Sequence, residues 1–171
     1  SVDYIFHQAA LPSVPKSIAE PLRTAEINAT GTLLVLEAAR QAGVKKVVFA
    51  SSCAVYGDNS ALPLSEVEIP SPLSPYAAQK LSGEHYCEVY STVYGLPTTV
   101  LRYFNVYGPR QDQTSQYAAV VPNFITAAVK SASPTIYGNG NQSRDLIFVA
   151  DAVQANLKAA HSSQADGAVV N

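Results

Sequence analysis

The stretch KKVVFAS, Lys45–Ser51, has an apolar centre without a polar interruption. Runs of this kind are typical of strands that are buried on both faces of a parallel sheet. Strand-like patterns also cover residues 2–8 and 98–104, while helical periodicity covers residues 19–42 and 75–94. Because strands and helices alternate along the chain, the pattern predicts crossover connections and a doubly wound, parallel α/β sheet.

Residues with strong positional preferences mark the ends of the longest helix. Ser74 is a good N-cap, Pro75 fits the first helical turn, and Gly95 ends the helix. Residues 11–16 contain two prolines and predict a loop. The rest of the chain continues the alternation. Its expected segments are a helix at 119–130, strands at 134–137 and 145–149, a helix to residue 161 capped by Asp151, and a strand beginning at Val169.

The composition indicates one globular domain. Of the 171 residues, 47% are hydrophobic and 14% are charged. The net charge of −2 argues against non-specific attraction to nucleic acid, and no apolar run approaches the length of a membrane span. Two cysteines and three scattered histidines form neither a disulfide framework nor a zinc motif, so no metal site and a cytoplasmic location are expected. The sequence lacks Met and opens in a strand pattern, which suggests a fragment.

Tyr76 and Lys80 are the first candidates for chemistry. Their spacing of four residues places both on one face of the predicted helix. An ammonium near a phenol favours the phenolate, although a base at neutral pH needs a shift of roughly 3 pKa units, or about 4 kcal/mol. The same spacing also arises by chance. However, Ser51, Ser52 and Asn105 follow the carboxyl ends of predicted strands, where ligands bind in such folds.

Taken together, five segments resemble a known family. They are HQAA, SSCAVYG, SPYAAQK, RYFNVYGPRQ and SRDLIFV, and they occur in order over essentially the whole chain. This set resembles the extended short-chain dehydrogenases/reductases, specifically the NAD-dependent sugar-nucleotide epimerase/dehydratase family. The resemblance implies a partial Rossmann-like sheet that lacks the first βαβ units and the glycine-rich turn. Residues 1–115 would be the C-terminal half of the NAD-binding domain. Residues 116–171 would be part of the substrate-binding lobe, interleaved with the last sheet strand.

The resemblance also implies roles for individual residues. Tyr76 would be the catalytic base, Lys80 would hold the nicotinamide ribose and lower the phenol pKa, and Ser52 would hydrogen-bond the reacting sugar oxygen. The residues expected to contact NAD are His7, Gln8, Ala9, Ala10, Ser51, Tyr76, Lys80 and Tyr103. Those expected to contact the sugar nucleotide are Ser13, Ser52, Cys53, Tyr76, Asn105, Tyr117, Val120, Val121 and Arg144.

One departure from the family pattern narrows the implied reaction. Dehydratases of the family carry Asp-Glu directly after the catalytic serine or threonine, and decarboxylases keep the Glu, whereas this chain has Cys53 and Ala54. The resemblance therefore implies epimerisation at C4 of a UDP-hexose, of the N-acetylglucosamine or the glucose type, through a transient keto sugar and tightly bound NAD. Residues 12–15 lie where family members differ around the sugar.

Other interpretations stay open at this point. The chain could belong to a reductase or epimerase for another nucleotide sugar, or to a non-catalytic nucleotide-binding or regulatory module with the same fold. The family resemblance implies a homodimer of the full-length protein through the helices near residues 19–42 and 75–94. The 171 residues alone are expected to bind NAD poorly and to turn over little.

Overall fold

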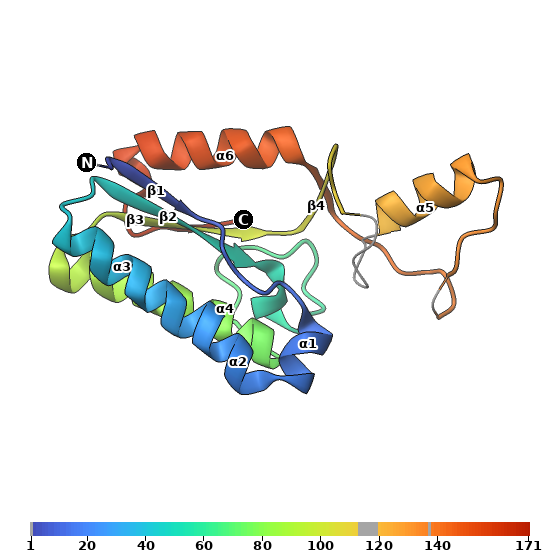
Figure 1. Cartoon of the computed structure of the whole chain (residues 1–171), viewed down its shortest axis with the longest axis horizontal. Coiled ribbons are helices and arrows are strands. Elements are labelled where there is room, and N and C mark those ends of the chain that lie inside the picture. The colour runs from blue at the N-terminus through green and yellow to red at the C-terminus, as the bar shows by residue number, and fades with distance from the viewer. Residues whose placement is uncertain (1, 113–119, 137) are drawn as a thin grey trace. The chain divides into compact units, whose positions relative to one another are not determined.

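The computed structural model describes residues 2–112, 120–136 and 138–171 (Figure 1). The chain divides into two compact units, one formed by Ser1–Tyr103 with Ala155–Asn171 and the other by Phe104–Gln154. The elements of the first part are β1 (Tyr4–His7), α1 (Val14–Ala19), α2 (Pro21–Ala25), the π-helix Glu26–Thr30, α3 (Gly31–Gln41), β2 (Lys46–Ser52), the 3₁₀ helix Cys53–Tyr56, α4 (Pro75–Tyr94) and β3 (Thr98–Tyr103). They are followed by β4 (Asn105–Tyr107), α5 (Val120–Val129), β5 (Leu146–Phe148), α6 (Val149–His161), the 3₁₀ helix Ser163–Ala165 and β6 (Val169–Val170).

The main sheet has four parallel strands in the order β1-β2-β3-β6. Helices α3 and α4 cover one face of this sheet and α6 covers the other, so the predicted doubly wound α/β arrangement is confirmed (Figure 1). In the register of the central pair, Phe49 lies opposite Val100 and Ser52 lies opposite Tyr103. All four strands therefore direct their carboxyl ends to the same edge of the sheet.

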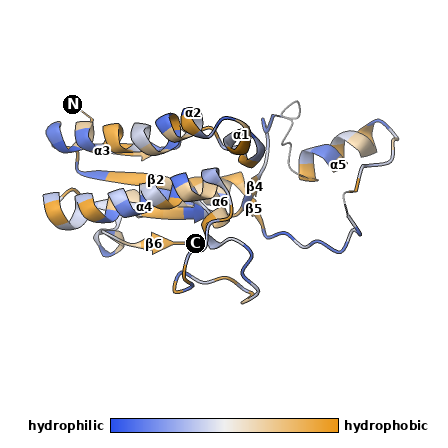
Figure 2. Cartoon of the chain, turned by 90° about the horizontal axis from the view of Figure 1, so that it is seen from below, coloured by the Kyte–Doolittle hydropathy of each residue, from blue (hydrophilic) through white to orange (hydrophobic). Residues whose placement is uncertain are grey.

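Strand β2 contributes to two hydrophobic cores because alternate residues of a strand face opposite sides. Val47 and Phe49 pack toward α3 and α4, whereas Val48 packs toward α6. The apolar run of β2 accordingly appears mostly orange between the helices in Figure 2. The larger core consists of Leu36, Ala39, Val44, Val47, Phe49, Cys87, Tyr90, Leu96 and Val100. Full burial of such a side chain contributes about 1.5–3 kcal/mol to stability.

Helix α4 begins and ends where the sequence predicts. Ser74 Oγ accepts a hydrogen bond from Ala77 N at 3.2 Å, and Gly95 adopts a left-handed conformation with φ of 67°. A glycine within the helix has a packing role, because a Cβ at Gly83 would lie 2.5 Å from the ring of Phe49. The absence of a side chain there lets α4 lie close against β2.

The helix predicted over residues 19–42 is confirmed as an unbroken series of helical turns from Pro21 to Gln41, whereas the loop predicted over residues 11–16 is wrong from Val14 onward. Helix α1 begins within that loop at Val14, after the N-cap Ser13. A second helix, α2, then starts at Pro21. The starts of α1 and α2 have the same cause, because proline lacks an amide hydrogen and the first turn of a helix does not use one. The segment is therefore α1, α2, a π-helical turn and α3 in series.

Three further expectations for the second half need correction. No strand forms at residues 133–136, and residue 137 lies outside the described residues. Helix α6 begins at Val149, so Asp151 lies in its first turn rather than at the cap. Strand β5 does not join the main sheet, because it pairs in parallel with β4, from Asn105↔Leu146 to Tyr107↔Phe148. A separate two-stranded sheet results.

Among the described residues, no helix has both the length and the apolar character needed to cross a membrane. The same part of the chain contains no group of three or more His, Cys, Asp or Glu side chains arranged to hold a metal ion.

Candidate active site

Lys80 is a buried cation next to the carboxyl end of β2. Its side chain extends from α4, and Nζ donates a hydrogen bond to Ala50 O at 2.7 Å. The ammonium also lies 5.0 Å from the centre of the Phe49 ring. Burial lowers the pKa of Lys80 to about 8, because the charged form loses its hydration. No carboxylate of the described residues forms an ion pair with Lys80, so its remaining N–H donors are available to a ligand.

Tyr76 lies one helical turn before Lys80 and interacts with Ser52. Burial raises the pKa of the Tyr76 phenol, a hydrogen bond from Ser52 lowers it, and the nearby Cys53 raises it. Burial is the largest of these effects on the Tyr76 pKa. Lys80 is not among the causes of the shift, so the lowering of this pKa expected from Lys80 is not seen in the chain by itself. The structure thus brings the side chains of Ser52 and Tyr76 together, with Lys80 on the same helix.

The local structure around Ser52 presents its hydroxyl at the end of the strand. Ser52 is the last residue of β2 and the N-cap of the following 3₁₀ helix. Its Oγ accepts a hydrogen bond from Ala54 N at 3.2 Å. The hydroxyl hydrogen therefore remains available to a partner such as Tyr76 or a bound substrate.

A short helix fixes the start of α4, and with it the position of Tyr76. Ser17 Oγ accepts a hydrogen bond from Tyr76 N at 3.0 Å and donates one to Val14 O at 2.7 Å. Ser13 is buried, and its Oγ accepts a hydrogen bond from Lys16 N at 3.0 Å. The side chain of Ser13 thus caps α1, while its expected contact with the sugar stays a prediction.

Five of the residues expected to contact NAD lie at the carboxyl ends of β1 and β3, namely His7, Gln8, Ala9, Ala10 and Tyr103. His7 is buried, its Nε2 lies 3.0 Å from Thr32 Oγ1, and its pKa is lowered by burial and by the charge of Lys80. Gln8 Nε2 donates to Tyr103 Oη at 3.2 Å and to Asn156 Oδ1 at 3.0 Å.

Small side chains follow at the same edge of the sheet. Ala9 is exposed and Ala10 is half-buried, so the backbone after β1 is accessible to a ligand.

Several predicted substrate contacts belong to the second compact unit. Asn105 opens β4, and its Nδ2 donates to Asp145 O at 3.0 Å. Arg144 is exposed, and its Nη1 donates to Ser143 O at 2.7 Å. Val120 and Val121 begin α5. The predicted contact at Tyr117 lies outside the described residues. The roles of these residues in binding stay predictions.

Two groups of buried polar side chains support the site. Asn28 Oδ1 accepts from Leu11 N at 2.7 Å, and its Nδ2 donates to Gln79 Oε1 at 2.9 Å, which ties the segment after β1 to α4. A second group links Ser51, Glu84 and Arg102. For this second group, the sequence signal is the spacing of two residues on one helix. Glu84 follows Lys80 by four residues and so shares its helix face.

A hydroxyl, a phenol and a buried ammonium at the carboxyl edge of a parallel, doubly wound sheet define a Rossmann-type site of the short-chain dehydrogenase/reductase class. Comparison with known families agrees with this geometry. The model described as "NAD dependent epimerase/dehydratase family" matches residues 1–171, and the chain belongs to this family.

Individual relatives are sugar-nucleotide enzymes. A putative UDP-glucose 4-epimerase of Methanocaldococcus jannaschii is 44% identical over 92% of this chain and 52% of the relative. A UDP-glucose 4-epimerase of Mycolicibacterium smegmatis is also 44% identical, over 92% of this chain and 50% of the relative. The solved UDP-N-acetylglucosamine 4-epimerase of Methanobrevibacter ruminantium is 51% identical with a TM-score of 0.95, over 99% of this chain and 54% of that chain. The chain thus spans about half the length of the relatives it matches.

Proposed function

We propose that this chain is the central part of an NAD-dependent epimerase that inverts C4 of a UDP-hexose. The observation that supports the proposal best is the meeting of Ser52 and Tyr76 at the carboxyl end of β2, one helical turn from the buried Lys80. In this proposal residues 1–115 supply the C-terminal half of the NAD-binding domain. Residues 116–171 supply part of the substrate-binding region, with β6 returning to the main sheet.

The residues present fit the nicotinamide half of NAD. Lys80 keeps N–H donors for ribose hydroxyls after its bond to Ala50 O, and Ala9 and Ala10 leave the backbone accessible beside the sheet. Two solved relatives support the same assignment, since a UDP-glucuronic acid 4-epimerase of Bacillus cereus and the protein MoeE5 are described with NAD bound. The glycine-rich turn that cradles the pyrophosphate is not among these 171 residues. When bound, NAD supplies an acceptor and donor of hydride.

The proton chemistry falls to the side chains of this chain. Tyr76 takes the proton of the C4 hydroxyl and later returns it, while Ser52 donates a hydrogen bond to the same sugar oxygen. Because burial raises the pKa of Tyr76, the chain alone stores its proton rather than releasing it. A second positive charge beside Lys80, such as an oxidised nicotinamide ring, favours the phenolate. In this proposal Tyr76 therefore becomes a base only when oxidised NAD is bound.

The residues after Ser52 favour epimerisation over the other reactions of the family. Elimination of water from a sugar needs an additional acid or base, which a carboxylate commonly supplies. Cys53 and Ala54 occupy the two positions that follow Ser52, and neither carries a carboxylate. Although a 38% identical relative is a UDP-N-acetyl-α-D-glucosaminuronate decarboxylase, the proposed reaction of this chain is removal and return of hydride at C4.

UDP-N-acetylglucosamine is the first substrate to test. This choice rests on the solved UDP-N-acetylglucosamine 4-epimerase, which shares 51% identity with the chain. UDP-glucose is the second, since two curated relatives that are 44% identical are named UDP-glucose 4-epimerases.

A homodimer of the full-length protein is part of the same proposal. Apolar side chains remain exposed on α3 at Leu34 (66%) and on α4 at Val93 (67%). A second copy placed against these helices would remove such surface from water. Light scattering of the full-length protein should therefore give twice the mass of one chain.

The test of function uses the full-length protein and each UDP-sugar in turn, with the product followed by NMR. Replacement of the base, Tyr76→Phe, should lower kcat by about 10²–10⁴-fold, the usual contribution of general acid–base catalysis. Tyr94→Phe removes an exposed phenol from the same helix and should leave kcat unchanged. Equal rates for Tyr76→Phe and the wild type would contradict the mechanism. A full-length protein that binds NAD and UDP-sugars without turnover would instead point to a binding module.

A further inference from the structure

Behind the proposed catalytic residues lies a buried network of three polar side chains. Ser51 Oγ donates a hydrogen bond to Glu84 Oε1. Arg102 binds the same carboxylate with two nitrogens, Nε to Oε1 at 3.0 Å and Nη2 to Oε2 at 2.7 Å. The side chains of Arg102 and Glu84 are only 5% and 4% exposed. The network joins β2, α4 and β3 at one level of the sheet.

This network encloses the turn that carries Ser52. Ser51 comes directly before Ser52, and Tyr56 ends the 3₁₀ helix that follows it. The guanidinium of Arg102 lies 4.7 Å from the centre of the buried Tyr56 ring. Arg102 thus contacts Tyr56 directly and is linked to Ser51 through the carboxylate of Glu84.

Glu84 also connects this turn to the helix that carries the other two catalytic groups. It lies one turn after Lys80 and two turns after Tyr76 on α4. The carboxylate holds Ser51 at the end of β2, while Lys80 donates to Ala50 O in the preceding residue of that strand. Two adjacent links therefore fix α4 against the carboxyl end of β2.

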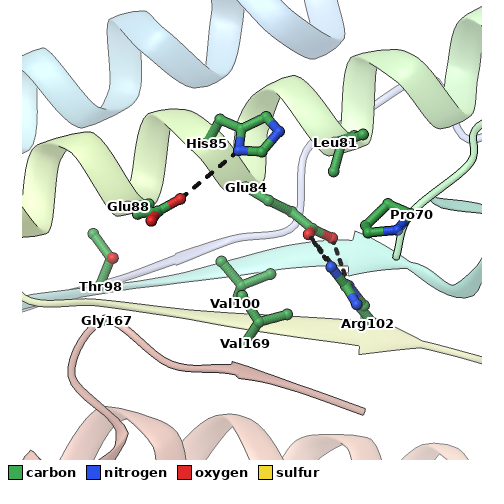
Figure 3. A pocket seen from close by; sticks show the side chains of 10 residues that line it. All are labelled: Pro70, Leu81, Glu84, His85, Glu88, Thr98, Val100, Arg102, Gly167 and Val169. Carbon is green, nitrogen blue, oxygen red and sulfur yellow. Dashed lines mark hydrogen bonds and ion pairs between the residues drawn. The ribbon is translucent and has the colours of Figure 1, made fainter. Parts of the chain in front are cut away.

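The ion pair forms a wall of a cavity of about 270 Å³ (Figure 3). The other residues that line it include His85, Glu88 and Val169. Arg102 Nη1 is buried and has no hydrogen-bond acceptor among the described residues. Glu84 is accordingly the anion that compensates the charge of Arg102, and the pair cannot lose one member without leaving a buried charge.

A buried ion pair is weak evidence for a stabilising role, because apolar residues of similar volume often give equal stability. A bidentate pair of a guanidinium and a carboxylate also fixes the positions of the two side chains relative to each other. We propose that Glu84 and Arg102 are positioning residues, which hold the Ser52 hydroxyl at its working place beside Tyr76. This inference rests on the proposed epimerase function.

The chain offers a matched control at the other end of the same strand. Lys46, at the amino end of β2, is buried and pairs with Asp166 at 2.7 Å, and it also donates to Ser162 O at 2.8 Å. Asp166→Asn therefore weakens an ion pair of the same length without altering any residue near Ser52, although Asp166 is 39% exposed and Glu84 only 4%.

The first test measures kcat and KM of the full-length enzyme with UDP-N-acetylglucosamine, together with Tm. Glu84→Gln should lower kcat by about 10–100-fold with KM changed by less than about threefold, because a misplaced hydroxyl slows the chemical step. Asp166→Asn should change kcat by less than about twofold, even if it lowers Tm as much as Glu84→Gln does. A kcat for Glu84→Gln no lower than that of Asp166→Asn would overturn the proposal.

A double variant separates positioning from stability. Glu84→Leu combined with Arg102→Met replaces the pair by apolar side chains, so Tm should return toward that of the wild type. The kcat should nevertheless stay low, since no fork holds the turn. Recovery of kcat together with Tm would reduce the pair to a structural role.

A second readout does not depend on turnover. Cys53 follows Ser52 directly and is half-buried, whereas Cys87 is fully buried. The rate of Cys53 alkylation by iodoacetamide, measured by peptide mass spectrometry, reports the order of this turn. Glu84→Gln should raise that rate by at least about tenfold over Asp166→Asn, through local opening. Equal rates would overturn positioning even in a protein without epimerase activity, whereas an inactive wild type with the expected difference in rates would overturn only the proposed function.

Discussion

Two lysines are buried to the same extent near opposite ends of β2, Lys46 within the strand and Lys80 on helix α4. Lys46 and Lys80 are each 4% exposed. Lys46, at the amino end, has a carboxylate partner in Asp166 at 2.7 Å. Lys80, at the carboxyl end, donates only to a backbone carbonyl, and burial lowers its pKa to about 8. The comparison teaches that the fold gives Lys46 a carboxylate partner at the amino end of β2, whereas Lys80 has none at the end where the NAD site is proposed.

The largest expected effect comes from removing the unpaired lysine. Lys80→Met should lower kcat of the full-length enzyme by about 10²–10⁴-fold, because the ammonium proposed to hold the nicotinamide ribose is lost. The same change should raise the free energy of unfolding near neutral pH by about 1–3 kcal/mol, since a buried charge without a counter-ion is removed. Turnover assays and urea unfolding measure the two effects. A stability loss instead of a gain would break the comparison.

Removal of the paired lysine should have the opposite effect. Lys46→Met should lower the free energy of unfolding by about 2–3 kcal/mol, since it removes two hydrogen bonds and leaves Asp166 without its partner. The kcat should stay within about twofold of the wild type, because Lys46 lies at the end of the strand away from Ser52. Urea unfolding and a turnover assay of the same preparation measure both quantities. A loss of kcat as large as that of Lys80→Met would show that the two ends are not separate in function.

The smallest expected effect is a dependence of stability on pH. The folded state gives up the proton of Lys80 near pH 8, whereas the unfolded chain keeps it until about pH 10.5. The unfolded state therefore binds more protons between these values, so stability rises with pH in this window. Between pH 7.5 and 9.5 the gain from Lys80 should be about 1–2 kcal/mol. The difference in free energy of unfolding between the wild type and Lys80→Met, measured with urea at each pH, isolates this gain. A difference that does not change with pH would contradict the lowered pKa of Lys80.

Local signals in the sequence were sufficient for much of the fold. Ser74, Pro75 and Gly95 predicted both ends of α4, and the apolar run of β2 predicted a buried parallel strand. These predictions succeed because a helix cap and a buried strand are each encoded by a few neighbouring residues. The spacing of Tyr76 and Lys80 likewise placed both on one helix face.

The remaining features depend on contacts between distant segments. The strand predicted at residues 145–149 is confirmed as β5, but its pairing with β4 across about 40 residues of chain was not predicted, because strands of three residues carry no signal for their partner. The π-helical turn Glu26–Thr30 within the helix predicted over 19–42 was not foreseen, and neither was the start of α1 at Val14 inside the predicted loop. The direction of the Tyr76 pKa shift was also out of reach, since it depends on how deeply the phenol is buried.

The hydrogen bond from Tyr76 N to Ser17 Oγ has a consequence for redesign of the enzyme. The family resemblance predicts that residues 12–15 lie beside the sugar, and this segment includes the start of α1, the helix that contains Ser17. A substitution in residues 12–15 that alters sugar preference can therefore also shift the start of α4, through the hydrogen bond between Ser17 and Tyr76. Variants chosen only for a new substrate will lose speed unless they preserve Ser17, so selectivity and rate must be optimised together.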